Sequence, residues 1–543
     1  MSDDETRGRS FDSYLEGERP ADFKTLSGIE LKPVYEASGD SKPEKPGEYP
    51  FTRGIHPEMY RTRLWTRRQQ SGFGTPRQSN ERLHYLLEQG QTGLNINPDA
   101  ASHLGLDEGA LGEGDLGLQG TSLVTLDDMT QLLDGIPIEK VSITFNFRPP
   151  ASAVIIAMFL LVAERRGVPR SELRGTCTNC ALSQVVGPTL QSNTHFFPVD
   201  FALRVGTDVM EFCAGEMPRW NILNINAYNI RETGVNAVQE AGFALSLACD
   251  YLERLTRRGV DIDSFAPRVG FFTAVHIDFF EEIAKLRAMR RIWARTMRQR
   301  FGARNERSCW FRTAVQTSAL PLTAQEPRNN IVRATVQTLA AVLGGCQSLH
   351  TTSWDEAYAL PTEESHRLSL RTQQVIAYET NVVKTADPLG GSHMVEQLTD
   401  RLEEEIVAVI DDIDRRGGFV QAFKDGWIEE EINRARIAYW DQVENGERPV
   451  VGVNVFDDAA AGPPDDAFFH LDRAVAEERL QAIRSHKEGP RDARFKPALA
   501  ALAAVAAGDE NVMPAVIEAV DAGATIGEIF DAFRDGIGYQ VPK

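Results

Sequence analysis

The sequence is poor in cysteine, in positive charge and in long hydrophobic runs. Six cysteines in 543 residues are too few for a disulfide framework and are typical of a reducing compartment. Basic residues number 58 and acidic residues 78, and the net charge of −20 disfavours binding to nucleic acid or to an anionic membrane surface. The longest apolar run, Ala151–Ala163, is shorter than the roughly 20 residues of a membrane-spanning helix. Residues 1–10 lack the apolar region of a signal peptide, so we expect a soluble, cytoplasmic protein.

Sequence motifs for common cofactors are incomplete. Gly112–Gly117 matches the pattern G-x-G-x-x-G, but no strand precedes it, and its two acidic residues would repel a pyrophosphate. Cys177 and Cys180 form one C-x-x-C pair without a second pair to complete a tetrahedral metal site, and we interpret them as incidental rather than redox-active. We therefore expect neither a dinucleotide site nor a metal centre.

Composition divides the chain into three parts. Residues 1–50 are rich in proline, glycine and charge, and we predict an extended arm that contacts another subunit. From 51 to 455, short β-branched runs alternate with long helices, which is the pattern of an α/β protein with a (β/α)8 TIM barrel. Residues 456–543 are predicted to form a linker and a C-terminal helical segment. The predicted strands are 93–98, 141–147, 173–178, 222–227, 269–275, 309–316, 347–351 and 382–385. The predicted helices include 151–166, 235–258, 279–300, 331–343, 472–484 and 498–507.

Several predicted strands carry small polar residues on one face, where barrel strands normally present aliphatic side chains. These residues are Ser142, Thr144, Asn146, Asn224, Asn226, His350 and Thr352. One interpretation is a barrel with a polar axis that admits a long, amide-rich ligand. The alternative is that these side chains point into loops, or that the strand register is shifted by one residue.

A basic cluster in this acidic protein consists of four arginines around Trp65. The arginines are Arg61, Arg63, Arg67 and Arg68. Guanidinium groups match phosphate oxygens and stack on rings, so the cluster predicts recognition of a nucleotide phosphate. The alternative is a solvated surface face.

The basic cluster begins a series of motifs that resembles the large chain of the methylmalonyl-CoA mutase family. The matching segments are Met59–Gln69, Asp134–Lys140, Phe265–Arg268, Ala284–Arg287, Gln316–Ser318, Gln347–Thr351, Asp355–Ala357, Ala386–Pro388 and Val451–Asn454. The resemblance implies a (β/α)8 barrel whose polar axis threads the pantetheine arm of coenzyme A. It also implies a radical 1,2-rearrangement with adenosylcobalamin, in which the carbonyl-CoA group of an acyl-CoA substrate migrates. The family's cobalamin-binding domain, with its D-x-H-x-x-G signature, is not found in this sequence, so a separate small subunit is expected to bind the cofactor in a heterodimer or heterotetramer.

The resemblance also assigns site residues. The coenzyme A contacts of the family fall on His56, Met59, Arg63, Thr66, Arg68, Asn95 and Arg268, and the residues that face the adenosyl group on Glu232, Gln316 and Glu356. The catalytic positions fall on Gln70, Tyr228, Asn229 and either Gln191 or Ser192. Further polar contacts to the substrate are expected from Arg148 and Asn97.

The acyl end of the site departs from the family pattern. Gln70 replaces a tyrosine, Asn229 and Ala314 replace histidines, and Gln191 or Ser192 replaces the arginine that binds the substrate carboxylate. Because an unpaired carboxylate is costly to bury, these changes favour an uncharged branched or hydroxylated acyl group, as in isobutyryl- and hydroxyisobutyryl-type mutases. Two alternatives remain open. Arg148 could restore the cation for a methylmalonyl-type substrate, or face solvent or a partner, and the chain could be a non-catalytic structural subunit.

Overall fold

The computed structural model describes residues 32–34, 44–109, 116–182, 197–457, 468–469 and 472–540. Gln191, Ser192, part of the Gly112–Gly117 segment, and most of the predicted arm and linker lie outside these residues. In the described part, no helix has the length and apolar character needed to cross a membrane.

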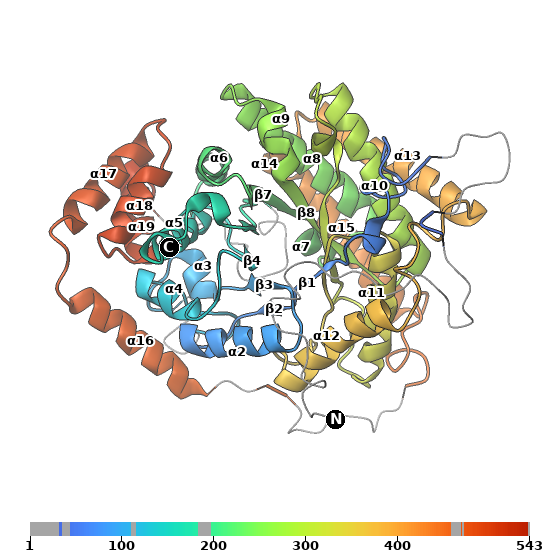
Figure 1. Cartoon of the computed structure of the whole chain (residues 1–543), viewed down its shortest axis with the longest axis horizontal. Helices are drawn as coiled ribbons and strands as arrows, with labels where there is room; N and C mark the ends of the chain where they lie inside the picture. The colour runs from blue at the N-terminus through green and yellow to red at the C-terminus, as the bar shows by residue number, and fades with distance from the viewer. Residues whose placement is uncertain are drawn as a thin grey trace, which may run out of the picture.

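The strands of the described residues form two five-stranded sheets in which all pairings are parallel (Figure 1). The first sheet has the order β1-β10-β9-β8-β7 and the second has the order β2-β3-β4-β5-β6. Only Arg68 and Gln69 separate β1 from β2, and only Ile222 separates β6 from β7. The strands are β1 Thr66–Arg67, β2 Gln70–Ser71, β3 Gly93–Ile96, β4 Ser142–Phe145, β5 Gly175–Cys177, β6 Trp220–Asn221, β7 Leu223–Asn226, β8 Val269–Val275, β9 Thr313–Thr317 and β10 Ser348–His350.

Helices follow most strands and surround the two sheets. Several begin with a capping box, in which the first side chain and the side chain three residues later satisfy free backbone N–H groups, as at Thr75 and Asn236. The α-helices up to the linker are α2 Pro76–Glu88, α3 Ala100–Leu104, α4 Leu126–Leu132, α5 Ala151–Arg165, α6 Val199–Glu216, α7 Ala227–Arg231, α8 Ala237–Arg257, α9 Ile262–Phe265, α10 Phe279–Gln299, α11 Asn329–Leu343, α12 Glu363–Tyr378, α13 His393–Arg415, α14 Phe419–Lys424 and α15 Trp427–Glu444. The 3-10 helices are η1 Met59–Arg61, η2 Arg170–Glu172, η4 Ala266–Arg268 and η5 Glu306–Cys309.

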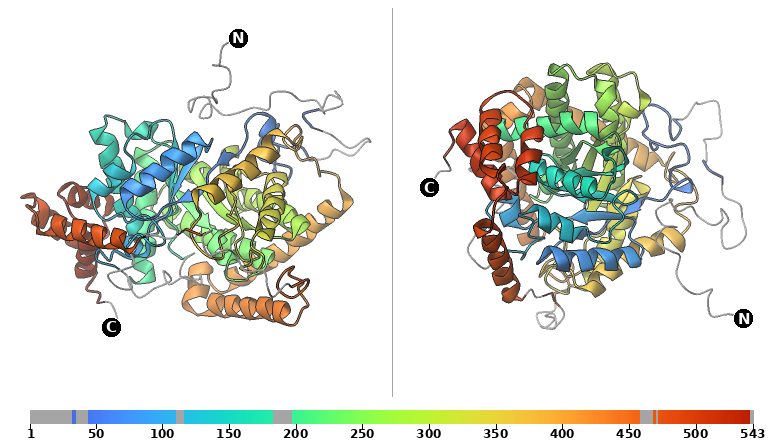
Figure 2. Two further views of the ribbon diagram at one scale, coloured as in Figure 1. Left: turned by 90° about the horizontal axis from the view of Figure 1, so that it is seen from below. Right: turned by 60° about the vertical axis from the view of Figure 1, so that its left-hand side comes forward.

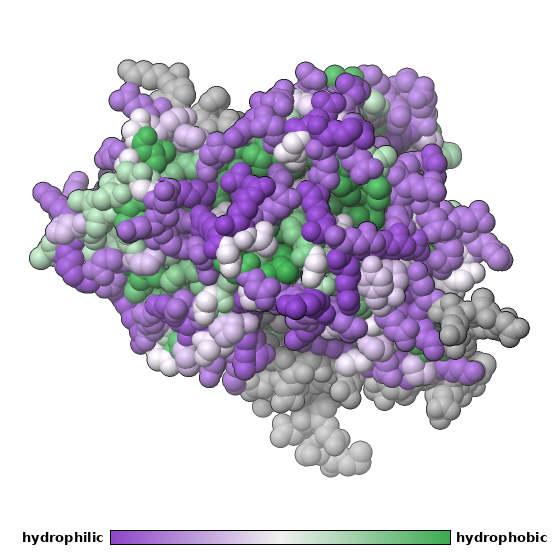
Figure 3. All heavy atoms as spheres, turned by 90° about the horizontal axis from the view of Figure 1, so that it is seen from above, coloured by the Kyte–Doolittle hydropathy of each residue, from purple (hydrophilic) through white to green (hydrophobic). Residues whose placement is uncertain are grey.

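The C-terminal residues form four helices, of which α18 and α19 pack against α3, α5 and α6 (Figures 1 and 2). The four helices are α16 Arg473–Glu488, α17 Phe495–Ala507, α18 Met513–Asp521 and α19 Ile526–Ile537. α18 and α19 cover the outer side of α5, so every residue from Ala151 to Ala163 is buried. This covering explains the longest apolar run of the sequence, because a helix with neighbours on all sides needs no polar face. From above, the surface is mostly hydrophilic, with apolar residues in separate patches (Figure 3).

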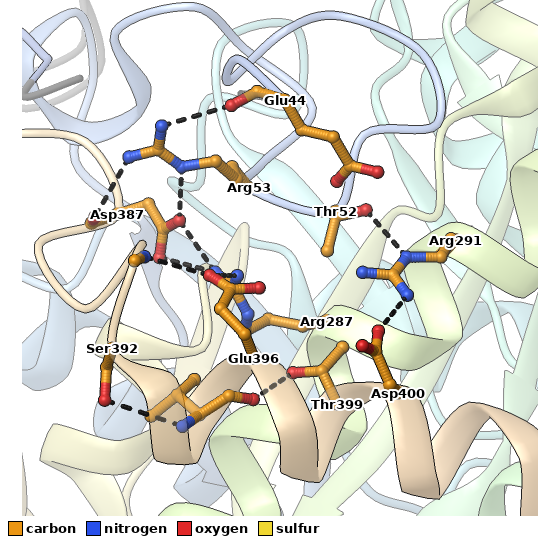
Figure 4. A network of polar contacts seen from close by, with 12 residues as sticks. Glu44, Thr52, Arg53, Arg287, Arg291, Asp387, Ser392, Glu396, Thr399 and Asp400 are labelled. Carbon is orange, nitrogen blue, oxygen red and sulfur yellow. Dashed lines mark hydrogen bonds and ion pairs between the residues drawn. The ribbon is translucent and has the colours of Figure 1, made fainter. Parts of the chain in front are cut away.

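The segment that precedes β1 is fastened to α10 and to the loop before α13 by a network that we call the N-terminal clasp (Figure 4). Arg53 Nε donates to Asp387 Oδ2 at 2.8 Å, and its Nη1 donates to the Glu44 carbonyl at 3.1 Å. Arg287 Nη1 donates to both oxygens of Asp387 at 2.7 Å, and its Nη2 donates to Glu396 at 2.7 Å. Two arginines from distant parts of the chain thus share one carboxylate, which fixes where the chain enters the first strand.

Most predicted strands are confirmed, but the prediction at 382–385 is wrong. Those residues form turns and bends, and the pattern missed β1, within the basic cluster, and β2, just after it. Arginine and glutamine conceal the pattern of these strands, because their stems pack in the wall while their heads make specific hydrogen bonds. The predicted strand at 309–316 also starts late, since η5 occupies its first residue and β9 begins at Thr313.

Candidate functional site

A cavity of about 1060 Å³ runs between the strands and is lined by residues of β1 and of β3 to β10. Its mouth is basic, although the protein as a whole carries a net charge of −20. Lys140, Arg174, Arg219 and Arg312 line the cavity and lie one or two residues before β4, β5, β6 and β9. Because all the strands are parallel, residues that precede them gather at the same end of the sheets. The geometry makes this mouth a site for an anionic group.

All seven residues expected to contact coenzyme A line this cavity. They are His56, Met59, Arg63, Thr66, Arg68, Asn95 and Arg268. The ring of His56 lies 5.1 Å from that of Trp310, edge to face. Burial and the positive charges of Arg312, Arg307 and Arg63 lower the pKa of His56. His56 is therefore neutral near pH 7, and its lowered pKa is a consequence of the positive potential at the mouth.

The guanidinium groups of Arg68 and Arg268 already have protein partners. Arg68 Nη2 donates to Ser142 Oγ at 2.7 Å and its Nη1 donates to Thr144 Oγ1, across the cavity wall. Burial and the charge of Arg63 lower the pKa of Arg68 to about 10, so it keeps its charge at neutral pH. Arg268 donates to carbonyls of the last residues of α6, including Ala214 at 3.0 Å. By contrast, Arg63 is exposed at the mouth.

The rest of the basic cluster supports the fold and does not line the cavity. Arg61 is buried and donates to the Lys384 carbonyl at 2.6 Å. Arg67 is 1% exposed and donates to the Gly90 carbonyl at 3.0 Å. The surface interpretation is therefore wrong for both. Arg67 and Arg68 differ because successive residues of an extended segment point to opposite sides of the wall.

The inner end of the cavity is a layer of side-chain amides. Asn146 Nδ2 donates to Asn95 Oδ1 at 2.9 Å and also to Asn97 Oδ1. On its other side, Asn146 Oδ1 accepts from the Thr178 hydroxyl at 3.2 Å. Asn95 and Asn146 both line the cavity, so these amides form its polar end wall.

The amide layer continues beyond the cavity through Gln70. Asn97 Nδ2 donates to Gln70 Oε1 at 2.9 Å, and Gln70 Nε2 donates to Gln316 Oε1 at 2.7 Å. Gln316 Nε2 then donates to the Tyr228 hydroxyl at 2.9 Å. We call the series from Thr178 through Asn146, Asn97, Gln70 and Gln316 to Tyr228 the amide chain. Every group in it is uncharged.

Most of the polar strand residues that stand out in the sequence line the cavity. Ser142, Thr144, Asn146, Asn224 and His350 line the cavity. Asn226 and Thr352 follow the alternative interpretation and serve the backbone. Asn226 Oδ1 accepts from the Asn229 N–H at 3.0 Å and caps α7, and Thr352 Oγ1 donates to the Thr317 carbonyl at 2.5 Å. Both lie where a strand turns into a loop, which a sequence pattern of period two does not locate.

Two carboxyl groups lie near the Tyr228 end of the amide chain. Glu232 accepts from the Ser318 hydroxyl and from the Ala319 N–H at 2.9 Å. Burial raises the pKa of Glu232 to about 7, against the opposing effect of these hydrogen bonds. Glu356 is exposed as a residue, but the surrounding protein removes water from its carboxyl group. This desolvation and the negative charges of Asp355 and Glu232 raise the pKa of Glu356 to about 7 as well.

Burial and the nearby charges of Glu232 and Glu356 raise the pKa of Tyr228 well above its ordinary value. Tyr228 therefore stays a protonated phenol. The structure thus brings together Glu232, Gln316 and Glu356, the residues expected to face an adenosyl group, and their carboxyl and amide groups can hydrogen-bond to the hydroxyls of a ribose.

Arg148 is buried at the end of β4, with 8% of its surface exposed, so the interpretation that it faces solvent is wrong. Burial lowers its pKa to about 9, which leaves it charged at neutral pH.

Asn229 lies in the first turn of α7 and is half-buried. Cys177 and Cys180 are both buried thiols that form no disulfide, and burial raises the pKa of Cys177 to about 12, so it is not a thiolate at neutral pH.

Sequence reasoning missed three residues behind Gln70. His350, His366 and Arg82 are buried around its backbone. In the sequence, His350 stands out only as a polar strand residue. Nothing in the spacing of His366 and Arg82 indicates that their side chains are in contact. In the described residues, no group of three or more histidine, cysteine or acidic side chains is placed to hold a metal ion.

Comparison with known proteins gives one consistent family. The family model "Methylmalonyl-CoA mutase" matches residues 24–539. The chain is 38% identical over 529 residues to the 2-hydroxyisobutanoyl-CoA mutase large subunit of Aquincola tertiaricarbonis, covering 95% of this chain and 92% of that protein. It is 37% identical over 526 residues to methylmalonyl-CoA mutase of Rhizobium meliloti (95% and 72%) and 36% identical over 534 residues to the mitochondrial enzyme of Homo sapiens (96% and 70%). These relatives are acyl-CoA mutases, which are isomerases, and the family depends on cobalamin. The chain belongs to the methylmalonyl-CoA mutase family.

Proposed function

We propose that this chain is the large subunit of an adenosylcobalamin-dependent mutase that rearranges an uncharged branched or hydroxylated acyl-CoA. The observation that carries the proposal is the cavity itself, with cations at its mouth and only uncharged amides and hydroxyls in the chain across its inner end. A phosphate-bearing ligand would enter from the cationic end, and its acyl group would meet the amide chain.

The two sheets are proposed to form one closed eight-stranded barrel, with β1–β2 and β6–β7 each acting as a single strand. Hydrogen bonds on both sides of each interruption support this. Arg68 N–H donates to the Leu349 carbonyl at 3.0 Å, and Thr92 N–H donates to the Arg67 carbonyl at 3.0 Å. At the other interruption, Asn224 N–H donates to the Thr178 carbonyl at 3.1 Å. In a closed barrel, the cavity runs along the axis.

An uncharged acyl group is proposed because a carboxylate in the amide chain would lack a counter-charge. Burying an unpaired carboxylate costs several kcal/mol. A hydroxyl, in contrast, can both donate to and accept from the side-chain amides of Gln70 and Asn97. The relative whose name specifies 2-hydroxyisobutanoyl-CoA supports a hydroxylated substrate.

The second candidate is a methylmalonyl-type substrate whose carboxylate pairs with Arg148. The buried cation at the end of β4 favours it, since a buried guanidinium is stabilised by an anionic partner. Turnover measured with the panel of acyl-CoA esters described below distinguishes the two candidates.

Adenosylcobalamin, when bound, supplies the 5′-deoxyadenosyl radical that removes a hydrogen atom from the substrate. On this chain, Glu232, Glu356 and Gln316 are proposed to hold the adenosyl group, and Tyr228 and Asn229 to orient the acyl group. A separate small cobalamin-binding subunit is proposed to carry the cofactor, docked partly through residues 1–50.

The proposal is tested first on the isolated chain. Isothermal titration with free coenzyme A and equilibrium dialysis with adenosylcobalamin should show binding of the former and no tight binding of the latter. Turnover is then measured with a panel of acyl-CoA esters in the presence of a small cobalamin-binding subunit. Tight, stoichiometric cobalamin uptake by the chain alone, or turnover of methylmalonyl-CoA in preference to hydroxylated esters, would contradict it.

A further inference from the structure

The backbone of Gln70 is held by side chains where a neighbouring strand would otherwise hold it. β1 pairs with β10 as far as Arg67 and Leu349, whereas β2 pairs only with β3, through Gln70 and Asn95. On the side of β10, the Gln70 N–H donates to His350 Nδ1 at 2.8 Å. The Gln70 carbonyl lies 3.0 Å from His366 Nε2. Two histidine rings therefore replace the ladder bonds at this residue.

The hydrogen-bond partners of His366 fix its tautomer. A backbone carbonyl only accepts, so Nε2 must carry the proton that is donated to Gln70. Arg82 Nη1 lies 3.3 Å from His366 Nδ1, and a guanidinium only donates, so Nδ1 must present its lone pair. Burial, the charge of Arg82 and the neighbouring His350 lower the pKa of His366 well below its ordinary value, which agrees with a neutral ring.

Arg82 is itself held firmly. Its Nη1 also donates to the Pro361 carbonyl at 3.1 Å, and its guanidinium carbon lies 4.9 Å from the centre of the Phe73 ring. The chain of contacts thus runs from α2 through a ring on α12 to the backbone of β2. It connects elements that are far apart in sequence, and it ends on the residue that joins Asn97 to Gln316.

We propose that His366, held by Arg82, is a positioning residue that fixes Gln70 and thereby sets which acyl groups the inner end of the cavity accepts. This inference rests on the function proposed above. The Gln70 amide has one bond on each side, at 2.9 Å to Asn97 and at 2.7 Å to Gln316. A backbone shift of about 1 Å would break one of them, and shifts of that size at a reacting group cost up to about a hundredfold in rate.

The test compares binding by the complete isolated chain and three variants. His366→Leu removes the donor to Gln70, whereas His366→Gln keeps an N–H donor close to the position of Nε2. His84→Leu is the matched control, since His84 lies on the same helix as Arg82 but contacts the Asp134 carbonyl, at 2.9 Å. Affinities are measured for free coenzyme A, 2-hydroxyisobutyryl-CoA and methylmalonyl-CoA.

We expect the native chain to prefer the hydroxylated ester and His366→Leu to lose roughly fivefold or more of that preference. The affinity for free coenzyme A should stay within about twofold, because the mouth is distant from His366. His366→Gln and His84→Leu should keep the native preference. If His366→Leu does not fold, Arg82→Met, which frees Nδ1 and lets the ring change tautomer, should lower the preference in the same direction.

Two results would overturn the inference. An unchanged preference in His366→Leu, or in Arg82→Met where that variant replaces it, would show that the ring only fills space. A native chain that binds coenzyme A without any preference between the esters would show that the amide chain does not select acyl groups. A native chain that binds no coenzyme A at all would instead overturn the proposed function together with this inference.

Discussion

At the scale of single residues, the inner end of the cavity and the Tyr228 region differ in the kind of group that they present. The amide chain offers fixed, uncharged donors and acceptors, while Glu232 and Glu356 are carboxyl groups whose pKa is raised to about 7. Groups of the first kind suit the stabilisation of partial charge on a carbonyl oxygen, because they need no reorganisation during the reaction. Groups of the second kind make the region sensitive to pH.

Asn229 is expected to act as a neutral donor to the thioester carbonyl of the substrate. Its backbone is fixed by the Asn226 cap at 3.0 Å, so replacing the side chain should leave α7 intact. Asn229→Ala should reduce turnover by roughly ten- to a thousandfold, the range for losing one preorganised donor. Affinity for coenzyme A should be unchanged, and Asn229→His, which keeps a donor, should retain activity. An unchanged rate in Asn229→Ala on every active ester would reduce Asn229 to a spacer.

Glu232 should make the free energy of unfolding depend on pH. Its folded pKa of about 7 lies above the ordinary 4.5, so the folded protein holds a proton that the unfolded chain releases. The free energy of unfolding should therefore decrease as pH rises from 4.5 to about 7. Glu232→Gln cannot ionise and should flatten this dependence in urea unfolding at about pH 5 and about pH 8. The exposed control Glu364→Gln should behave as the native chain, and an equal slope in Glu232→Gln would contradict the assignment.

At the scale of elements, the last turn of α6 is capped by Arg268, the last residue of η4. Arg268 donates to the carbonyls of Cys213 at 3.3 Å, Ala214 at 3.0 Å and Met217 at 3.2 Å. The Cys213 and Met217 carbonyls also accept backbone N–H groups, from Met217 and Trp220. Arg268 therefore adds donors at the end of α6, where helix carbonyls have few partners, and its positive charge compensates the helix dipole. A residue expected to bind coenzyme A thus has a second role in ending a helix.

The two roles of Arg268 can be separated by comparison with Arg63, which is exposed at the same mouth. Arg268→Met should lower the free energy of unfolding by about 1–3 kcal/mol, the range for hydrogen bonds from a charged group. Arg63→Met should weaken coenzyme A binding while leaving the free energy of unfolding nearly unchanged. Chemical denaturation and isothermal titration on both variants provide the measurements. Equal stability of Arg268→Met and the native chain would show that the cap contributes nothing.

At the scale of the whole molecule, ion pairs of long sequence separation hold the chain's entry to β1 against its outer helices (Figure 4). The side chains of Arg287 and Asp387 are 1% and 6% exposed, and Arg53 bonds the same carboxylate. Surface ion pairs on α13 are different, since the side chains of Arg401 and Glu405 are 67% and 43% exposed. The N-terminal clasp is therefore an ionic network whose loss should destabilise the fold.

Arg287→Ala should lower the free energy of unfolding by about 3–5 kcal/mol, because it leaves buried acidic groups with fewer partners. Arg401→Ala, the control, should change it by less than about 1 kcal/mol. Urea unfolding of both variants gives the comparison. Similar small effects in both would show that water replaces the lost partner and that the clasp is not a stabilising network.

Most of the alternating strands and helices, the apolar helix at 151–166 and the seven residues expected to contact coenzyme A could be predicted from the sequence. The first two follow from local periodicity and the third from motifs in chain order, and neither depends on which strand meets which. Strands β1 and β2 escaped prediction because their stability comes from pairing with β10 and β3, not from their own composition.

The hydrogen-bond partners of the polar side chains depend on the tertiary structure. Gln70 and Gln316 are 246 positions apart, and His366 and Gln70 are 296 positions apart, yet each pair lies within hydrogen-bonding distance. Tertiary packing also distinguishes Arg63 from Arg268, because Arg63 remains exposed at the mouth whereas Arg268 caps α6. Hydrogen bonds are directional and act over about 3 Å, so their partners are set by the packing of distant elements and not by spacing along the chain.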